Sequence, residues 1–540
     1  MILYHTKNHG AQWGKDDWGR YYQLLRWLDE PIENAPRHFP QPSEVFNAYL
    51  HGAANAHDLY DFLMSDSTPN NSYYAYYHNT QLANFSRLNV KLPEEYQFIH
   101  TFMDAIRKRV LEVELYRGDL PTEASGIAMT LSYSGGLDIL IELLARMEGL
   151  SFTRGYLFDS MSKSAVFSHL VRCTFPDTEN DTSEKFKSIA EDRKIGEKRL
   201  LETAMYAPQW AGHIEYTLGW AGLESAVWWL HAHTKDRLWN VEKEIRDSWV
   251  ASIAKMTPLD ADSLLEGAVG TRWFNEVYAS LGEARWEKLY AAAKFASNGS
   301  GHARARLYAD AMLGRLDYDV LRKRMLTKRY QDGAKAIGLL PLPENRLDLE
   351  HEILKRYQDL QEFLRTGKKY GAQRQQNERR SVELGIENLA RAAGYDDPKR
   401  MVWKLEAQDV ADLADGRYAV FADDVELSLS ITPWGEVEME IIKENGRVLK
   451  NIPARIKKNE AVQYLLKLKD TVAKQGSRMR ASLEDSMVRA DLFSVPDLHD
   501  LVAHPVLRVL VSQLVFICDG DLGFPVAGKA FQLEGVDGKR

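Results

Sequence analysis

The chain has 540 residues, of which 45% are hydrophobic and 27% are charged, as in an ordinary soluble globular protein. This length predicts several structural units, and the composition excludes a chain that is mainly disordered. The formal net charge of -8 excludes a wholly basic nucleic-acid binder, although local basic patches remain compatible with it.

The chain contains two cysteines, Cys173 and Cys518, which are too few and too far apart for a disulfide framework. We therefore expect a reducing compartment and a cytoplasmic location. The first residues lack the apolar core of a signal peptide. No apolar run in the sequence is long enough to span a membrane.

Residues 1–200 form a predicted N-terminal helical region in which helices alternate with polar, proline-containing loops. Pro31 is expected to stop the first helix, Ser43 to cap the second and Pro93 to begin the third. The polar stretch 176–198 is either a long loop or a solvated helix. The helices predicted from apolar spacing cover residues 16–30, 43–64, 93–117, 135–147 and 163–173.

Residues 201–411 form a predicted central helical array, in which helices are separated by short Gly or Pro interruptions. Successive helical hairpins without an exact repeat predict an irregular α-solenoid or a bundle-like arrangement. The clearest of these helices cover residues 263–281, 283–296, 302–313, 347–364 and 373–393.

Near Gly416 the periodicity changes from helical to alternating, which predicts a smaller α+β domain over residues 412–540 with an antiparallel β-meander. Asn445-Gly446 predicts a tight hairpin within this meander. An open sheet edge is costly, so we expect this domain to be truncated from a longer protein or to need a partner. Its predicted strands cover residues 426–431, 436–442, 447–450, 514–518 and 531–533, and its helices 459–475, 477–488 and 494–514.

The stretch from Met205 to Asp236 has the densest chemistry in the chain, because tryptophans, histidines and carboxylates lie close together in it. Apolar stripes predict two packed helices, and His231 and His233 point about 200° apart on a helix. The polar groups then form either a hydrogen-bonded rim, which is favoured, or an enzyme site; a metal site is not expected. The candidate catalytic residues are His213, Glu215, His231, His233, Lys235 and Asp236.

Two basic regions are candidates for contact with an anion or a nucleic acid. A glycine-rich turn opens the helix at 302–313 beside cations, and basic helices lie at 315–335 and 365–380. Solvated helix faces are the favoured alternative, because nearby glutamates dilute the positive charge. The candidate residues are His302, Arg304, Arg306, Lys369, Arg374, Arg379 and Arg380.

No cofactor is predicted. The segment 523–530 has the glycine and lysine spacing of a phosphate-binding loop, but Ala530 replaces the hydroxyl residue that holds magnesium. Pro525 also removes one amide from such a loop, and the residues that follow indicate a strand instead of a helix.

Four stretches, at residues 205–236, 292–302, 369–395 and 479–515, carry a resemblance to a known family. From about residue 120 onward the chain resembles the domain-of-unknown-function family forty-one thirty-two. Its members are often labelled molybdate metabolism regulators or accompany WGR domains. The tripeptide at 433–435 lacks the arginine of that motif.

The resemblance implies a bacterial helical-repeat protein, whose relatives are encoded in some genomes near MoxR-type AAA+ ATPases and von Willebrand factor A proteins. We therefore expect a cytoplasmic scaffold or regulatory protein that acts through protein–protein contacts. The family supplies no catalytic residues, and the lack of a complete catalytic motif favours a protein that is not an enzyme. A nucleic-acid-linked regulator and an enzyme with its site at 205–236 remain the alternatives.

Overall fold

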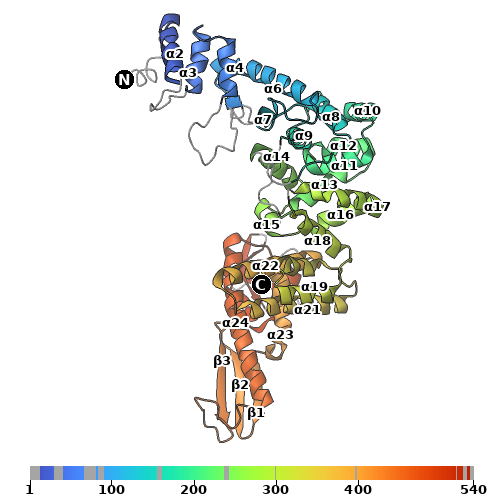
Figure 1. Ribbon diagram of the computed structural model, residues 1–540. Coiled ribbons are helices and arrows are strands. Elements are labelled where there is room, and N and C mark those ends of the chain that lie inside the picture. The colour runs from blue at the N-terminus through green and yellow to red at the C-terminus, as the bar shows by residue number, and fades with distance from the viewer. Residues whose placement is uncertain are drawn as a thin grey trace. The chain divides into compact units, whose positions relative to one another are not determined.

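A computed structural model of the chain describes residues 13–29, 40–65, 81–82, 91–154, 161–235, 243–297, 299–395, 398–518, 520–526 and 532–535 (Figure 1). The chain divides into two compact units, Met1–Arg315 and Leu316–Arg540. The division into three regions at residues 200 and 411 stays a prediction.

The first half of unit 1 is a series of short amphipathic helices (Figure 1). The polar stretch 176–198, for which the sequence allowed either a long loop or a helix, contains the helix α10. Its N-cap Thr182 accepts a hydrogen bond from the amide of Lys185. The described elements are α2 (Lys15–Asp29), α3 (Pro42–Leu50), α4 (Ala56–Met64), η2 (Glu94–Tyr96), α6 (Ile99–Leu115), α7 (Ser125–Ala128), α8 (Leu137–Arg146), α9 (Lys163–Arg172) and α10 (Ser183–Asp192).

The single helix predicted over residues 43–64 is wrong, because the structure has two helices there, α3 and α4. Gly52 adopts the left-handed conformation with φ of 69° just after α3 ends. The side chain of Asn55 then accepts hydrogen bonds from two amides in the first turn of α4. Ser43 lies inside α3, whose N-cap is Gln41.

In the second half of unit 1, α13 packs against α11, α12, α14, α15, α16 and α18. The helix predicted over residues 263–281 is divided at Gly267, which is left-handed with φ of 119°. The elements are α11 (Glu197–Tyr206), η3 (Pro208–Trp210), α12 (Ala211–Leu218), α13 (Leu223–Ala232), α14 (Lys243–Ala254), α15 (Ala261–Glu266), α16 (Thr271–Leu281), α17 (Glu283–Ala292), η4 (Ala293–Ala296) and α18 (His302–Met312).

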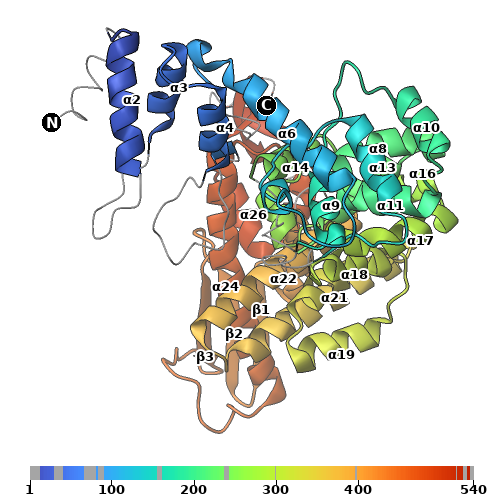
Figure 2. The same cartoon turned by 45° about the horizontal axis from the view of Figure 1, so that its top comes forward.

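Unit 2 begins with helices, of which α21 and α22 lie side by side (Figure 2). Helix α22 also packs closely on α20, and Gly385 makes this approach possible because a Cβ there would lie 2.4 Å from the backbone oxygen of Ala334. The elements are α19 (Tyr318–Lys328), α20 (Gln331–Ala336), η5 (Ile337–Leu339), α21 (Arg346–Gly367), α22 (Ala372–Ala392), α23 (Pro398–Asp409) and η6 (Ala411–Leu413).

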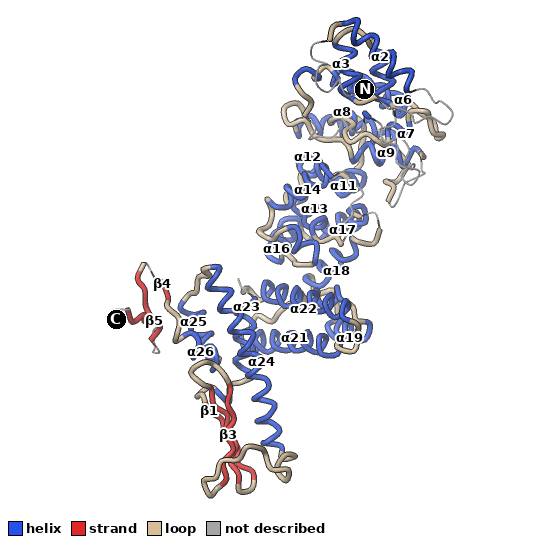
Figure 3. Tube along the Cα trace, turned by 90° about the vertical axis from the view of Figure 1, so that its left-hand side faces the viewer, coloured by secondary structure: helices blue, strands red, loops and turns tan. Residues whose placement is uncertain are grey.

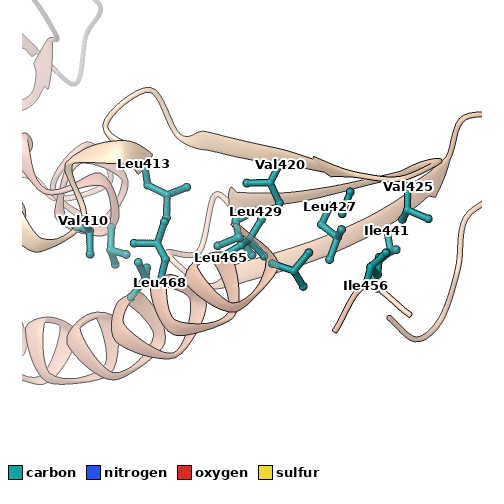
Figure 4. Close-up of a cluster of buried hydrophobic side chains, with 14 residues drawn as sticks. Val410, Leu413, Val420, Val425, Leu427, Leu429, Ile441, Ile456, Leu465 and Leu468 are labelled. Atoms are coloured by element: carbon teal, nitrogen blue, oxygen red, sulfur yellow. The ribbon is translucent and has the colours of Figure 1, made fainter. Parts of the chain in front are cut away.

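The predicted β-meander is a three-stranded antiparallel sheet in the order β1 (Arg417–Ala422), β2 (Val425–Ile431) and β3 (Val437–Lys443). Alternation places Leu427 of β2 opposite Val420 and Ile441 of its neighbours. These side chains pack against α24 (Glu460–Arg489) in one apolar core (Figure 4). The sequence interpretation missed β1. In place of the strand predicted over residues 447–450, the hairpin at Asn445 forms a single bridge between Ile442 and Val448.

The two helices predicted over 459–475 and 477–488 are one continuous helix, α24. Gly476 does not break it, because α26 packs there and a Cβ at this glycine would lie 3.3 Å from Val506. The remaining elements are α25 (Val495–Ala503), α26 (Pro505–Val511), β4 (Phe516–Cys518), β5 (Asp521–Val526) and β6 (Gln532–Gly535). The last three form a second antiparallel sheet (Figure 3), and its β4 packs through Phe516 against the cluster that includes Leu498 and Leu501 of α25.

The expected fold class is confirmed, since the chain is mainly helical and ends in a smaller region with an antiparallel meander. The first strand begins at Arg417, next to the predicted change in periodicity at Gly416. Among the described helices, none combines the length and the apolar character that crossing a membrane requires.

Candidate functional site

The stretch that begins at Met205 forms a packed seam between α12 and α13. Trp210, Trp228 and Trp229 are buried in it. The indole Nε1 of Trp210 donates to Thr174 Oγ1 over 2.9 Å, so this buried polar atom is satisfied. The ring of Trp229 stacks on His233 with 4.3 Å between centroids. These contacts identify the aromatic residues as core packing groups.

His231 and His233 both hydrogen-bond to backbone groups inside this core. His231 Nε2 lies 3.0 Å from the oxygen of Met205. Burial lowers the pKa of His231 to about 4, so the ring is neutral at pH 7. His233 Nδ1 lies 2.7 Å from the oxygen of Trp229, and its Nε2 accepts the amide of Gly270. The second ring is therefore the neutral tautomer with its proton on Nδ1.

The other candidates in the stretch also have local structural contacts. His213 Nε2 lies 2.8 Å from the backbone oxygen of Asp181. Glu215 accepts the amide N–H of Glu224 over 2.8 Å, in the first turn of α13. Lys235 is exposed and its amide donates to the oxygen of Gly301. Asp236 lies outside the described residues.

The described members of this group contact different elements and do not converge on one cleft. Two of them are sealed in the core, one contacts the backbone before α10, one satisfies a helix terminus and one faces the solvent. In the described ranges, no three His, Cys, Asp or Glu side chains are placed to hold a metal ion. The seam therefore supplies packing and hydrogen bonds.

Arg304, a candidate for anion contact, is buried and donates to backbone oxygens. Its Nε donates to His233 over 2.9 Å, and its Nη atoms donate to the oxygens of Thr234, Leu264 and Leu265. These carbonyls end α13 and α15, where the helix dipole is negative. Arg304 thus joins two helix ends and is not available to a surface ligand.

The residues on either side of Arg304 also have partners in the chain. The ring nitrogen Nδ1 of His302 lies 3.0 Å from Ser297 Oγ, and burial lowers the pKa of this histidine. The guanidinium of Arg306 lies over the ring of Tyr290, 4.2 Å from its centroid.

The second basic group is only partly neutralised. Arg374 Nε donates to Glu378 over 3.0 Å, and Arg380 pairs with Glu383 over 3.5 Å. Lys369 and Arg379 are exposed, and neither pairs with a carboxylate among the described residues. The structure therefore separates the cations of this region into those used for local pairing and those that face solvent.

An exposed apolar surface near the C-terminus was not predicted from the sequence. No other described stretch of this length exposes as many large apolar side chains as the segment between Met487 and Phe524. The sequence pattern did not indicate them, because they lie outside the apolar stripes that α24, α25 and the second sheet bury. We call them the C-terminal apolar surface: Met487, Val488, Leu492, Val495, Val515, Ile517, Leu522 and Phe524.

Two family models match the chain, and both describe families of unknown function. Residues 6–405 match DUF5724, and residues 446–539 match DUF4132. The resemblance to family forty-one thirty-two is thus supported for residues 446–539. The stretches at 205–236, 292–302 and 369–395 lie within the other match. No curated protein and no solved structure matches the chain. Since the first model covers most of its length, the chain belongs to the family of unknown function DUF5724.

Proposed function

We propose that this protein is a scaffold or regulatory protein of the cytoplasm that acts through protein–protein contacts. The observation that carries the proposal is the C-terminal apolar surface. Within it, Val488 and Leu492 are each 88% exposed and Ile517 is 74% exposed. Contiguous exposed apolar patches are typical of protein interaction sites, and within this group Ile517 and Leu522 are neighbours across two paired strands.

The small second sheet supplies part of this surface. In its register Ile517 of β4 lies opposite Leu522 of β5, so both side chains stand on the same face. Phe516 precedes them and packs against the buried cluster that includes Leu498 and Leu501 of α25. One face of the sheet is thus anchored in a core while the other presents apolar groups to solvent. A partner that covers this face would bury these apolar side chains, and each Å² of apolar surface removed from water would favour binding by about 25 cal/mol.

The structural roles of the histidines and carboxylates in the seam support this proposal over an enzyme with its site there. Each described candidate forms the backbone hydrogen bonds reported above. The implied genomic neighbours make a MoxR-type AAA+ ATPase and a von Willebrand factor A protein the first partners to test.

The test is site-specific photo-crosslinking in the native bacterium. A photoreactive residue is placed at Ile517 in one protein and at Leu347 of α21 in another; the second position is 77% exposed and lies outside the surface. We expect one dominant crosslinked protein from position 517 and none from position 347. The same products from both positions would contradict the proposal.

A double variant, Ile517→Glu with Leu522→Glu, then measures how much the surface contributes to binding of the partner. We expect association with the crosslinked partner to weaken at least about tenfold, which corresponds to about 1.4 kcal/mol. The matched control, Val320→Glu with Leu347→Glu, changes two other exposed apolar residues and should bind as the wild type does. Unchanged binding by the first pair would show that this surface is not the contact.

A further inference from the structure

Unit 2 contains a cleft of about 880 Å³ that the scaffold role does not use. One wall is a stripe along α21, where Tyr357, Gln361 and Lys368 follow one another at intervals of about one or two helical turns. The start of α22 forms another wall, and single residues of α19, α23 and α24 complete it. Its size is that of a pocket for a small molecule.

Most of the carboxylates that line the cleft are already paired with arginines. Glu378 accepts from Arg329 Nε over 2.9 Å and from Arg374 Nε over 3.0 Å. Arg322 pairs with Asp359 over 2.7 Å and with Glu362 over 2.6 Å. These three acids therefore contribute little negative potential to the cleft.

The cations of the cleft are not neutralised in the same way. Arg365 and Lys368 at the end of α21, and Arg379 on α22, are exposed and line the cavity. None of the three pairs with a carboxylate in the described part of the chain. Lys467 of α24 lies near Asp409 of α23, and the two opposite charges cancel. The residues that line the cleft, together with the Arg329 and Arg374 that pair with Glu378, comprise seven cations and four carboxylates, an excess of three positive charges.

The beginning of α22 adds to this positive potential. Its N-cap is Gly371, and no side chain caps its first turn. The unpaired amides at such a helix end carry partial positive charge. Gln375, one turn further on, lines the cleft together with Arg379. Three cations thus line one concave surface, with the N-terminus of α22 next to it, which is an arrangement that favours a multiply charged anion.

We propose that this cleft binds a small molecule with two or more linked phosphate groups, held by Arg365, Lys368 and Arg379. A nucleic-acid strand fits less well, because the charge is confined to one cleft and the neighbouring basic residues Arg374 and Arg380 are already paired. The inference is independent of the proposed protein–protein contacts.

Isothermal titration calorimetry on the full chain tests the proposal with two probes, inorganic tripolyphosphate and adenosine triphosphate, in magnesium-free buffer. We expect saturable binding of tripolyphosphate. Equal affinity for the two probes would assign the ligand to phosphate groups alone, and tighter adenosine triphosphate binding would assign it to a nucleotide. No binding of either probe at millimolar concentration would overturn the proposal.

The triple variant Arg365→Gln, Lys368→Gln, Arg379→Gln should lose at least about tenfold in affinity. A control variant with the same change in net charge, Lys323→Gln, Lys328→Gln, Lys450→Gln, alters exposed lysines that do not line the cleft. It should bind tripolyphosphate within about twofold of the wild type. Circular dichroism verifies that both variants are folded.

Two results would contradict the site. An equal loss in both triple variants would show that binding is a non-specific effect of net charge. A single-stranded oligonucleotide that binds more tightly than tripolyphosphate, and loses its affinity in the first variant only, would overturn the small-molecule assignment in favour of nucleic acid.

Discussion

The Nε atom of Arg304 donates a hydrogen bond to the backbone oxygen of His233 over 2.9 Å, across 71 residues of sequence. The sequence suggested separate roles for these residues, anion contact for the arginine and catalysis for the histidine. In the structure they belong to one contact, in which a buried cation is satisfied by carbonyl oxygens at two helix ends. No carboxylate among the described residues pairs with this arginine.

Replacing Arg304 with Gln should lower the free energy of unfolding of unit 1 by about 3 kcal/mol, because several buried carbonyls lose a charged donor. Urea unfolding followed by tryptophan fluorescence measures this, since most tryptophans lie in unit 1. Arg306→Gln on the same helix is the control. It should cost only about 0.5–1 kcal/mol through its contact with Tyr290. Equal stability of R304Q and the wild type would contradict the assigned role.

Glu114 and Arg117 form an ion pair over 2.8 Å in which both side chains are completely buried. Glu114→Gln should destabilise unit 1 by about 3–5 kcal/mol, because the guanidinium stays buried without a compensating charge. Differential scanning calorimetry should show a clearly lower unfolding temperature. The matched change Glu112→Gln breaks an exposed pair with Arg109, and its effect should stay below about 1 kcal/mol. Similar shifts in both variants would argue against burial as the cause.

Gly385→Ala tests the close approach of α22 to α20. An alanine usually stabilises a helix interior by about 1 kcal/mol relative to glycine. Here we expect a loss of about 1–3 kcal/mol, because the added Cβ would meet the oxygen of Ala334 at 2.4 Å. Hydrogen exchange of peptides covering α20 should accelerate. Gly126→Ala has open space around the new Cβ and should not weaken the fold; a stabilised G385A protein would show that the helices are not packed this closely.

Acid should destabilise unit 1 between about pH 6.5 and pH 4. Burial lowers the folded-state pKa of His169 and of His231 to about 4, whereas an unfolded histidine titrates near 6.5. The unfolded chain therefore takes up protons first as the pH falls, so stability is lost through this window and is unchanged by these groups below it. Each histidine contributes up to about 3 kcal/mol of this loss.

Urea unfolding at pH 7 and at pH 4.5 measures the effect. The variant His231→Gln should be less stable at pH 7, because the ring packs in the core, but its stability should fall less steeply between the two pH values. An unchanged pH dependence would show that this histidine titrates normally in the folded protein.

Much of the secondary structure could be predicted from the sequence, because it depends on local preferences. Apolar spacing predicted α8, α18, α21 and α22 close to their observed bounds, and strand alternation predicted β2 and β3. Two of the errors occurred where the effect of a glycine on a helix could not be known from the sequence. Gly267 ends a helix in the left-handed conformation, whereas Gly476 stays within α24, where Val506 of α26 packs against it.

The candidate sites were less predictable, because their chemistry depends on partners far away in the chain. Nothing local to His231 indicates that its ring meets the oxygen of Met205, 26 residues earlier. The cleft beside Arg365 was not predicted either, since it requires α19, α21, α22, α23 and α24 together.

By itself, the sequence determined most of the helices and strands, the apolar faces they bury and the mainly helical class, since these follow from side-chain periodicity along one segment. Only the tertiary structure decided which polar groups are taken up by hydrogen bonds and ion pairs within the chain and which face the solvent. Hydrogen bonds and ion pairs extend over about 3 Å, so the folded path of the chain determines whether a histidine or an arginine meets a backbone oxygen, a carboxylate or the solvent.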